Sequence, residues 1–144
     1  VIENVKAIRE FAGDRAVLRA FHFFEENKRV DAEVEALEKK DFATFFNKIT
    51  ESGDSSWKWL QNCYCNETPD EQSITVALAL TKLYLDKFGR GVCRVHGGGF
   101  AGVIAAFLPK EETEGFTKYI NKALGEGSAY VMHIRPQGAV KVEF

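Results

Sequence analysis

The chain has 144 residues, of which 45% are hydrophobic and 28% are charged. This balance is typical of one ordinary globular domain and argues against a disordered, fibrous or membrane protein. Nineteen Lys and Arg against 21 Asp and Glu give a formal net charge of -2. The chain therefore lacks the broad positive field that drives binding to nucleic acids or anionic membranes, and we expect neither partner.

The cysteines and the ends of the sequence bear on its origin. Three cysteines, an odd number, fit a reducing cytoplasm better than a secreted disulfide framework, so we expect a cytoplasmic protein. Cys63 and Cys65 form a single C-x-C pair with no second pair, and we expect no metal site there. The chain begins at Val1 and its single methionine is Met132. We therefore expect it to be a processed or excised piece of a longer polypeptide.

The first half of the chain is predicted to be helical. Apolar residues recur at intervals of three and four across residues 15–39 without Gly or Pro, which predicts one long amphipathic helix. Asp41 is a candidate N-cap for a second helix, expected to end near the Ser and Gly residues of 52–56. A loop is expected over residues 61–69. The next helix is expected to run from there to about residue 88 and, being apolar nearly all round, to pack on more than one side.

The second half is predicted to contain strands. Residues 92–95 favour a β-strand, and residues 103–108 are an apolar run whose length and flanking Gly and Pro favour a strand over a short helix. A helix is expected over residues 111–124. Residues 130–135 and 139–144 are expected to pair as a hairpin. Together these elements predict a single α+β domain with a mostly antiparallel sheet packed against helices.

The strongest functional signal is a cluster of glycines between the first two predicted strands. Gly97, Gly98, Gly99 and Gly102 occupy four of six positions. Glycine tolerates close approaches that side chains forbid, which suits a loop whose N–H groups face the oxygens of a ligand. The spacing matches G-x-G-x-x-G, but no second parallel strand follows, and the Lys-Ser or Lys-Thr of a P-loop is missing. The alternative is a tight turn that only lets two strands pack closely.

Two polar residues before the glycines are further candidates. Arg94 and His96 share one strand face because side chains alternate along a strand. Arg94 could steady a carboxylate or the loop, and we favour a structural ion pair over contact with a phosphate. His96 could touch a substrate or transfer a proton, because the reference pKa of histidine is near neutrality. For His96 we favour a side chain at the strand end that bonds to the backbone.

These residues resemble a known family. The segment formed by residues 94–102 resembles the third conserved motif of the GHMP sugar and small-molecule kinases, in the form found in galactokinases. Residues 19–30, 51–56 and 60–65 are also similar to galactokinase sequence, and the likeness spans about residues 15–144. The motif reads Arg94-Val95-His96-Gly97-Gly98-Gly99-Phe100-Ala101-Gly102.

The resemblance implies the C-terminal half of a two-domain enzyme, with the ferredoxin-like α+β fold of GHMP kinase C-terminal domains. It implies phosphorylation of galactose at the anomeric hydroxyl, with ATP and magnesium. The family's phosphate loop, catalytic aspartate and most sugar contacts lie in an N-terminal domain, so that domain is the implied partner and residues 1–144 alone are expected to be inactive. Ala101 stands where many members have glycine, and His96 where many have a small polar residue. The alternatives are a kinase for another sugar or small alcohol, and a non-catalytic module that senses sugar or nucleotide.

The resemblance also implies a role for the loop. It would close the active-site cleft and press its backbone toward the phosphates or the sugar. We expect that a bulky replacement of Gly98 or Gly99 abolishes the activity of the full-length enzyme and leaves the domain folded. No catalytic residue is expected in this chain. The implied binding residues are Gly97, Gly98, Gly99, Phe100 and Gly102, with Arg94 and His96 as further candidates.

Overall fold

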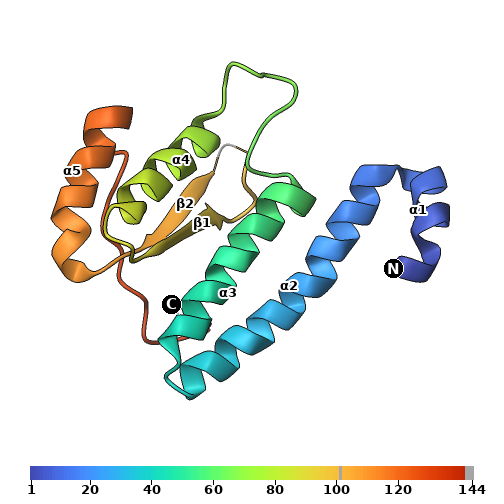
Figure 1. Cartoon of the computed structure of the whole chain (residues 1–144), viewed down its shortest axis with the longest axis horizontal. Helices are drawn as coiled ribbons and strands as arrows, with labels where there is room; N and C mark the ends of the chain where they lie inside the picture. The colour runs from blue at the N-terminus through green and yellow to red at the C-terminus, as the bar shows by residue number, and fades with distance from the viewer. Residues whose placement is uncertain (101, 142–144) are drawn as a thin grey trace. The chain divides into compact units, whose positions relative to one another are not determined.

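The computed structural model describes residues 1–100 and 102–141, which adopt an α+β fold dominated by helices (Figure 1). This confirms the predicted fold class, whereas the ferredoxin-like fold and the single-domain organisation stay predictions. Contacts divide the chain into two compact units, Val1–Pro109 and Lys110–Phe144. In chain order the elements are η1 (Ile2–Asn4), α1 (Val5–Ala12), α2 (Asp14–Glu38), α3 (Phe42–Ser55), η2 (Ser56–Leu60), α4 (Ser73–Asp86), β1 (Val92–His96), β2 (Val103–Phe107), η3 (Lys110–Glu112) and α5 (Thr113–Leu124).

The predicted long helix is α2, which has 25 residues and is therefore about 38 Å long. It packs along α3, and Val17 and Ala36 are buried (Figure 1). Asp41 caps α3 as predicted, because its carboxylate accepts hydrogen bonds from the backbone N–H of Thr44 at 3.0 Å and from the Thr44 hydroxyl at 2.7 Å. The two helices therefore form an antiparallel pair joined by a short, capped turn.

The predicted end of α3 near residues 52–56 is confirmed, because the α-helix ends at Ser55. The chain does not enter a loop there, as it leads directly into η2, a π-helical turn that is followed by Gln61 with φ 58° and ψ 45°. The Ser and Gly residues form the face of α3 that contacts other elements. A Cβ added to Gly53 would lie only 3.1 Å from the Cβ of Arg94, and Ser52 has no exposed surface. Small residues here allow α3 to lie against β1.

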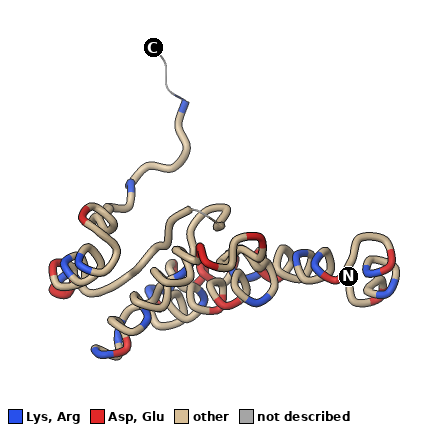
Figure 2. Tube along the Cα trace, turned by 90° about the horizontal axis from the view of Figure 1, so that it is seen from above, with Lys and Arg blue, Asp and Glu red and all other residues tan. Residues whose placement is uncertain are grey.

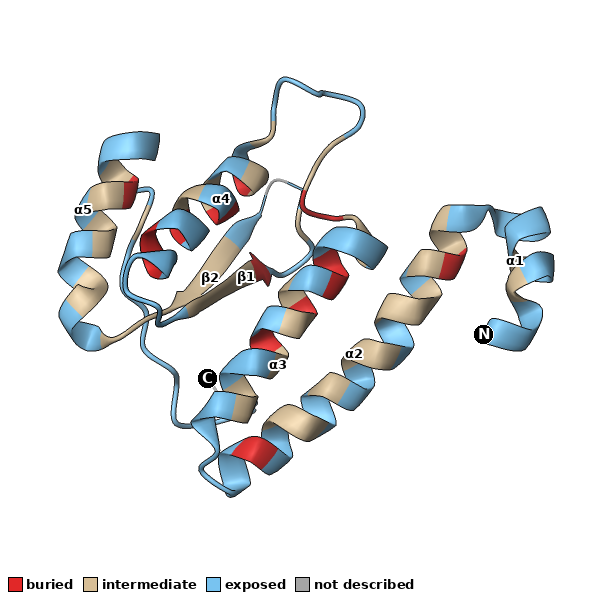
Figure 3. Ribbon diagram, viewed as in Figure 1, coloured by how far each residue is buried: buried red, intermediate tan, exposed pale blue. Residues whose placement is uncertain are grey.

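The two strands pair as predicted. β1 and β2 are antiparallel, with Val95 opposite Ile104 and His96 opposite Val103. The apolar run after the glycines is therefore a strand and not a helix. Arg94 faces α3, whereas Val95 packs in the core on the α4 side. The sheet thus lies between α3 and α4, and buried residues recur on both helices (Figure 3).

The helix α4 begins later than expected, at Ser73. Just before it, the Gln72 side chain accepts a hydrogen bond from the Cys65 N–H at 3.1 Å and donates to the Cys65 carbonyl at 2.7 Å. These bonds hold the preceding loop and leave Gln72 outside the helix. The expectation that α4 packs on more than one side is not met within the described residues. One face is buried, but Val76 and Leu83 are 46% and 61% exposed.

The second unit contains η3 and α5, which confirms the predicted helix. The predicted C-terminal hairpin is wrong within the described residues, because 129–141 form no strand. The remainder of that hairpin, 142–144, lies outside the described residues. Apolar residues do alternate here, but Met132 and Ile134 are 75% and 89% exposed. An isolated hairpin is only marginally stable in water, which agrees with the absence of strands in this described segment.

Charges of both signs are interspersed along the helices (Figure 2). Many form pairs one helical turn apart, such as Lys58 with Asp54 at 2.7 Å and Lys28 with Glu25 at 2.6 Å. Exposed pairs of this kind contribute only a few tenths of a kcal/mol each. Across residues 1–100 and 102–141, no helix combines the length and the apolar character that a membrane span requires.

The contact between α3 and β1 can be tested by substituting Gly53 with valine. Helix propensity alone predicts a slightly more stable protein, because glycine is the poorer helix former. The crowding against Arg94 predicts the opposite sign, a loss of about 1–3 kcal/mol in the free energy of unfolding. Urea denaturation measures it, with the exposed Ala43→Val on the same helix as the control. Equal or greater stability of Gly53→Val would show that the close approach is not a constraint.

Candidate functional site

The candidate site is the glycine loop, defined as the described residues 97–100 and 102 between β1 and β2. Ala101 lies outside the described residues. Gly97 and Gly99 have φ values of 72° and 79°, in the left-handed region that favours glycine. Phe100 shares this region, with a φ of 58°, although it carries a side chain. The Gly102 N–H donates to the Gly99 carbonyl at 3.1 Å and closes a tight turn.

The back of the loop lies against Asn62, which is 2% exposed. The Phe100 N–H donates to the Asn62 backbone carbonyl at 2.7 Å, and the Asn62 side-chain amide donates to the Gly98 carbonyl at 3.2 Å. A Cβ added to Gly99 would lie 2.2 Å from the Asn62 carbonyl oxygen, closer than real atoms approach. Glycine is therefore required at position 99 for packing as well as for its backbone angle.

The front of the loop is open. A Cβ added to Gly97 or Gly98 would meet no atom within 4 Å, and the Phe100 side chain is 49% exposed. A ligand can therefore approach the backbone at Gly97 and Gly98 without displacing any side chain. Backbone N–H groups in such a turn suit an anionic or hydroxyl-rich ligand, as the sequence predicts. This corrects one expectation from the sequence, that the domain stays folded when either Gly98 or Gly99 is replaced by a bulky residue. A side chain at position 98 meets no atom, whereas a side chain at position 99 would clash with Asn62.

Arg94 points away from the open front and into a polar network between α2, α3 and β1. Its Nη1 donates to Glu26 Oε1 at 3.2 Å and to the Ser52 hydroxyl at 2.5 Å, while its Nε donates to the Val95 carbonyl at 3.0 Å. The Ser52 hydroxyl in turn donates to Glu26, and Arg29 Nε donates to the same carboxylate at 2.8 Å. This is the structural ion pair that the sequence favours for Arg94.

The electrostatics of this network keep Glu26 ionised. Burial alone would raise the pKa of Glu26, but hydrogen bonds from Ser52 and Arg29, together with the charges of Arg29 and Arg94, hold that pKa below its ordinary value. His22, whose Nδ1 lies 3.0 Å from the Ser55 hydroxyl, is next to the network. Burial lowers the pKa of His22, although the Glu26 carboxylate acts in the opposite direction. The neutral histidine and the charged carboxylate are therefore the forms that this packing favours.

The other predicted candidate, His96, lies exposed at the end of β1, next to the loop. The structure thus brings the loop residues together on one turn, with His96 at its base and Arg94 behind it. Sequence reasoning missed Asn62, which supports the loop, as well as Ser52 and Gly53. The only signal for Asn62 was its place in the galactokinase-like stretch 60–65, because no local pattern links it to glycines 36 residues later.

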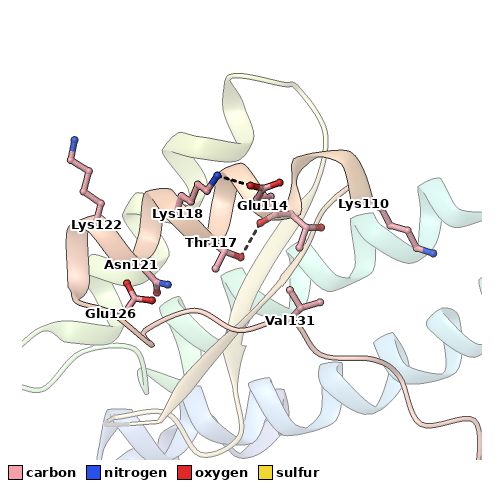
Figure 4. Close-up of a pocket in the computed structure, with 9 residues that line it drawn as sticks. Lys110, Glu114, Thr117, Lys118, Asn121, Lys122, Glu126 and Val131 are labelled. Atoms are coloured by element: carbon pink, nitrogen blue, oxygen red, sulfur yellow. Dashed lines mark hydrogen bonds and ion pairs between the residues drawn. The ribbon is translucent and has the colours of Figure 1, made fainter.

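A concave region lies along α5, with a volume of about 700 Å³ (Figure 4). Its lining includes Glu114, Thr117 and Lys118, and Val131 from the segment that follows. Lys118 is paired with Glu114 at 2.5 Å, and the Thr117 hydroxyl donates to the Thr113 carbonyl at 2.9 Å. These polar groups bond to one another, and no residue predicted for the site lies here, so we assign this region no ligand.

Magnesium, which the resemblance implies, does not fit the part of the chain that the structure describes. There, no group of three or more His, Cys, Asp or Glu side chains is arranged to hold a metal ion. Hard cations such as magnesium prefer oxygen ligands, chiefly carboxylates, waters and the phosphates of a substrate. Glu26, which pairs with Arg94 on the strand that leads into the loop, already accepts hydrogen bonds from three donors. We therefore derive no step through a metal on this chain.

Comparison of the chain with protein-family models, with curated proteins and with solved structures finds no match. A functional assignment therefore depends on the motif residues and on the geometry of the loop.

Alanine substitutions at two adjacent glycines test the geometry of the loop. Gly99→Ala adds a clash with Asn62 to the strain of a positive φ, so we expect a loss of about 2 kcal/mol or more in the free energy of unfolding. Gly98→Ala has open space and no positive φ, and a change within about 0.5 kcal/mol is expected. Thermal and urea unfolding provide the measurement. Equal effects of the two substitutions would contradict the described contact with Asn62.

The polar network predicts a pH-dependent effect of Glu26→Gln. Since the pKa of Glu26 is lower in the folded state, its contribution to stability is present above the ordinary value near 4.5 and is lost as the pH falls through the folded pKa. At pH 7 we expect Glu26→Gln to be less stable by about 1–3 kcal/mol. The difference from the original chain should shrink below pH 4.5. Glu35→Gln, on the exposed side of α2, is the matched control. A difference that does not depend on pH would rule out the charged network.

Proposed function

We propose that this chain is the C-terminal domain of an ATP-dependent sugar kinase that transfers a phosphoryl group to the anomeric hydroxyl of galactose in the cytoplasm. The observation that carries the proposal is the form of the glycine loop, whose front is open while its back is fixed on Asn62. The galactokinase-like motif lies on this turn. A turn that only joined two strands would explain Gly97 by its positive φ and Gly99 by its φ and its contact with Asn62, but it gives no reason for glycine at position 98.

The proposed role of the loop follows from the chemistry of phosphoryl transfer. Such reactions need little covalent chemistry from the protein, and catalysis comes mainly from positioning and from stabilising the charge on the transferred group. A loop with an open backbone can bring its N–H groups close to phosphate or sugar oxygens. In this proposal Gly97 and Gly98 form the contact surface, and Phe100 adds an exposed apolar surface beside it. Closure of the loop over the substrates would exclude water and strengthen these contacts.

The rest of the first unit serves as a rigid support in this proposal. The sheet is packed between α3 and α4, and the Arg94–Glu26–Ser52 network fixes the strand that leads into the loop. Small displacements of substrate-positioning groups can reduce catalytic rates by about two orders of magnitude, so such support has functional value. Arg94 would then act through the strand rather than on a phosphate. His96, at the base of the loop, is the one polar side chain of the motif that is free of this network and able to contact an acceptor.

The proposal places ATP and magnesium mainly against a partner domain that carries a phosphate-binding loop and a catalytic aspartate. This chain would supply the opposite wall of the cleft. A kinase for another sugar or for a small alcohol would use the same loop, because the acceptor is not fixed by the motif. The experiment below therefore uses several acceptors.

The test is acceptor-dependent ADP release by the full product of the natural gene, measured with galactose, other sugars and small alcohols. We expect turnover with galactose and none from the 144-residue chain alone. Gly98→Val should reduce turnover at least a hundredfold without unfolding the protein, because its side chain would occupy the open front of the loop. Gly138→Val is the matched control, since Gly138 also has open space and no positive φ. Unchanged turnover in Gly98→Val would exclude the loop from the reaction, and absence of turnover with every acceptor would exclude the kinase.

A further inference from the structure

Asn62 is a buried polar residue that the motif does not include. It follows Gln61, whose left-handed backbone ends η2, and the Gln61 carbonyl accepts a hydrogen bond from Arg15 Nη2 at 2.9 Å. Arg15 belongs to α2, so the backbone at this point is fixed by two separate elements. Only 2% of Asn62 is exposed. A residue held in this way can fix the conformation of a neighbouring loop that contacts it.

Asn62 contacts three consecutive residues of the glycine loop. Its side-chain amide donates to the Gly98 carbonyl, its backbone carbonyl accepts from the Phe100 N–H, and its atoms fill the space where Gly99 would carry a Cβ. Asparagine suits this place because its amide group is a donor that an aspartate side chain lacks. Alanine lacks the amide altogether.

The conformation of the loop requires such a support. Phe100 adopts a positive φ that side chains rarely tolerate, and strained backbone persists only where the surroundings enforce it. The one hydrogen bond that we describe for the Phe100 N–H goes to Asn62, and the bond from Asn62 to Gly98 holds the other side of the turn. A substitution of the Asn62 side chain removes the bond to Gly98, so that the backbone bond to Phe100 alone would have to hold the strained turn. We then expect the loop to relax toward ordinary backbone angles and to move the open face at Gly97 and Gly98.

We propose that Asn62 is the positioning residue of the glycine loop: it sets the backbone conformation that presents Gly97 and Gly98 to the ligand. The effect on turnover rests on the proposed kinase function. The effect on the loop itself does not, so the two can be measured separately. Asn62 would not touch the substrate, and its influence would pass through Gly98 and Phe100.

The first measurement is amide hydrogen exchange in the 144-residue chain, with Asn62→Ala and Asn62→Asp. We expect exchange at the Phe100 and Gly102 amides to become at least tenfold faster, while the amide of the buried helical residue Ile49 is unchanged. The matched control is Ile74→Val, a small change in the core cluster, among whose described members no loop residue occurs. It should leave the exchange of both loop amides as it is. If Asn62→Ala unfolds the chain, the exchange of the Phe100 and Gly102 amides is measured in Asn62→Asp instead, because aspartate keeps the volume of the side chain.

The second measurement is the kinetics of the full gene product with the same variants. We expect both Asn62 variants to lower kcat at least tenfold with less than a twofold change in the KM for galactose, because a displaced loop weakens positioning in the transition state. Ile74→Val should leave both constants unchanged. Unaltered exchange at Phe100 and Gly102 overturns the proposal, and so does faster exchange with unaltered kcat. If the original enzyme shows no sugar-dependent turnover, the kinase proposal fails, and faster exchange still supports the role of Asn62 in fixing the loop.

Discussion

The close contact between α3 and β1 is the constraint on which the rest of the first unit depends. Gly53 removes the side chain that would separate the two elements, and Arg94 then reaches Glu26 on α2 and Ser52 on α3. Burying charges is unfavourable unless they are paired and hydrogen-bonded, and here the Glu26 carboxylate has three donors. One partly buried network therefore ties two helices to the strand that leads into the glycine loop.

The loop is continuous with β1 on one side and contacts Asn62 on the other. Its back is fully packed at Gly99, whereas its front is open at Gly97 and Gly98. The division explains why four glycines occur so close together. Some are needed for the backbone angle and for packing against Asn62, and Gly98 is needed for neither. Gly98 is thus the glycine for which neither the backbone angle nor the packing gives a reason.

Local sequence patterns were sufficient for much of the fold. The 3.6-residue period predicts α2, the Asp41 cap is explained by residues within one helical turn, and the β-favouring runs on either side of the glycines predict β1 and β2. The patterns failed where distant residues decide the outcome. Residues 52–56 do hold the end of α3, but a local pattern could not predict that Ser52 and Gly53 contact Arg94, about 40 positions away. The C-terminal alternation resembles a hairpin, but a two-stranded hairpin is only marginally stable without further packing.

The same distinction applies to the candidate site. The glycines and their flanking Arg94 and His96 could be identified from the motif, and the ion pair of Arg94 could be preferred from its chemistry. Neither Asn62 nor Glu26 could be connected with the loop, because a single sequence carries no information about pairs of residues 36 or 68 positions apart. These long-range contacts determine the conformation of the glycine loop and of the strand that leads into it.

The central claim is that the open face of the glycine loop meets a phosphorylated or sugar ligand. The most direct test is a crystal structure of the full gene product with galactose and a non-hydrolysable ATP analogue. We predict that the backbone at Gly97 and Gly98 lies within hydrogen-bond distance, about 3 Å, of a sugar or phosphate oxygen. A structure in which both ligands are bound elsewhere, and these two glycines face only solvent, would contradict it.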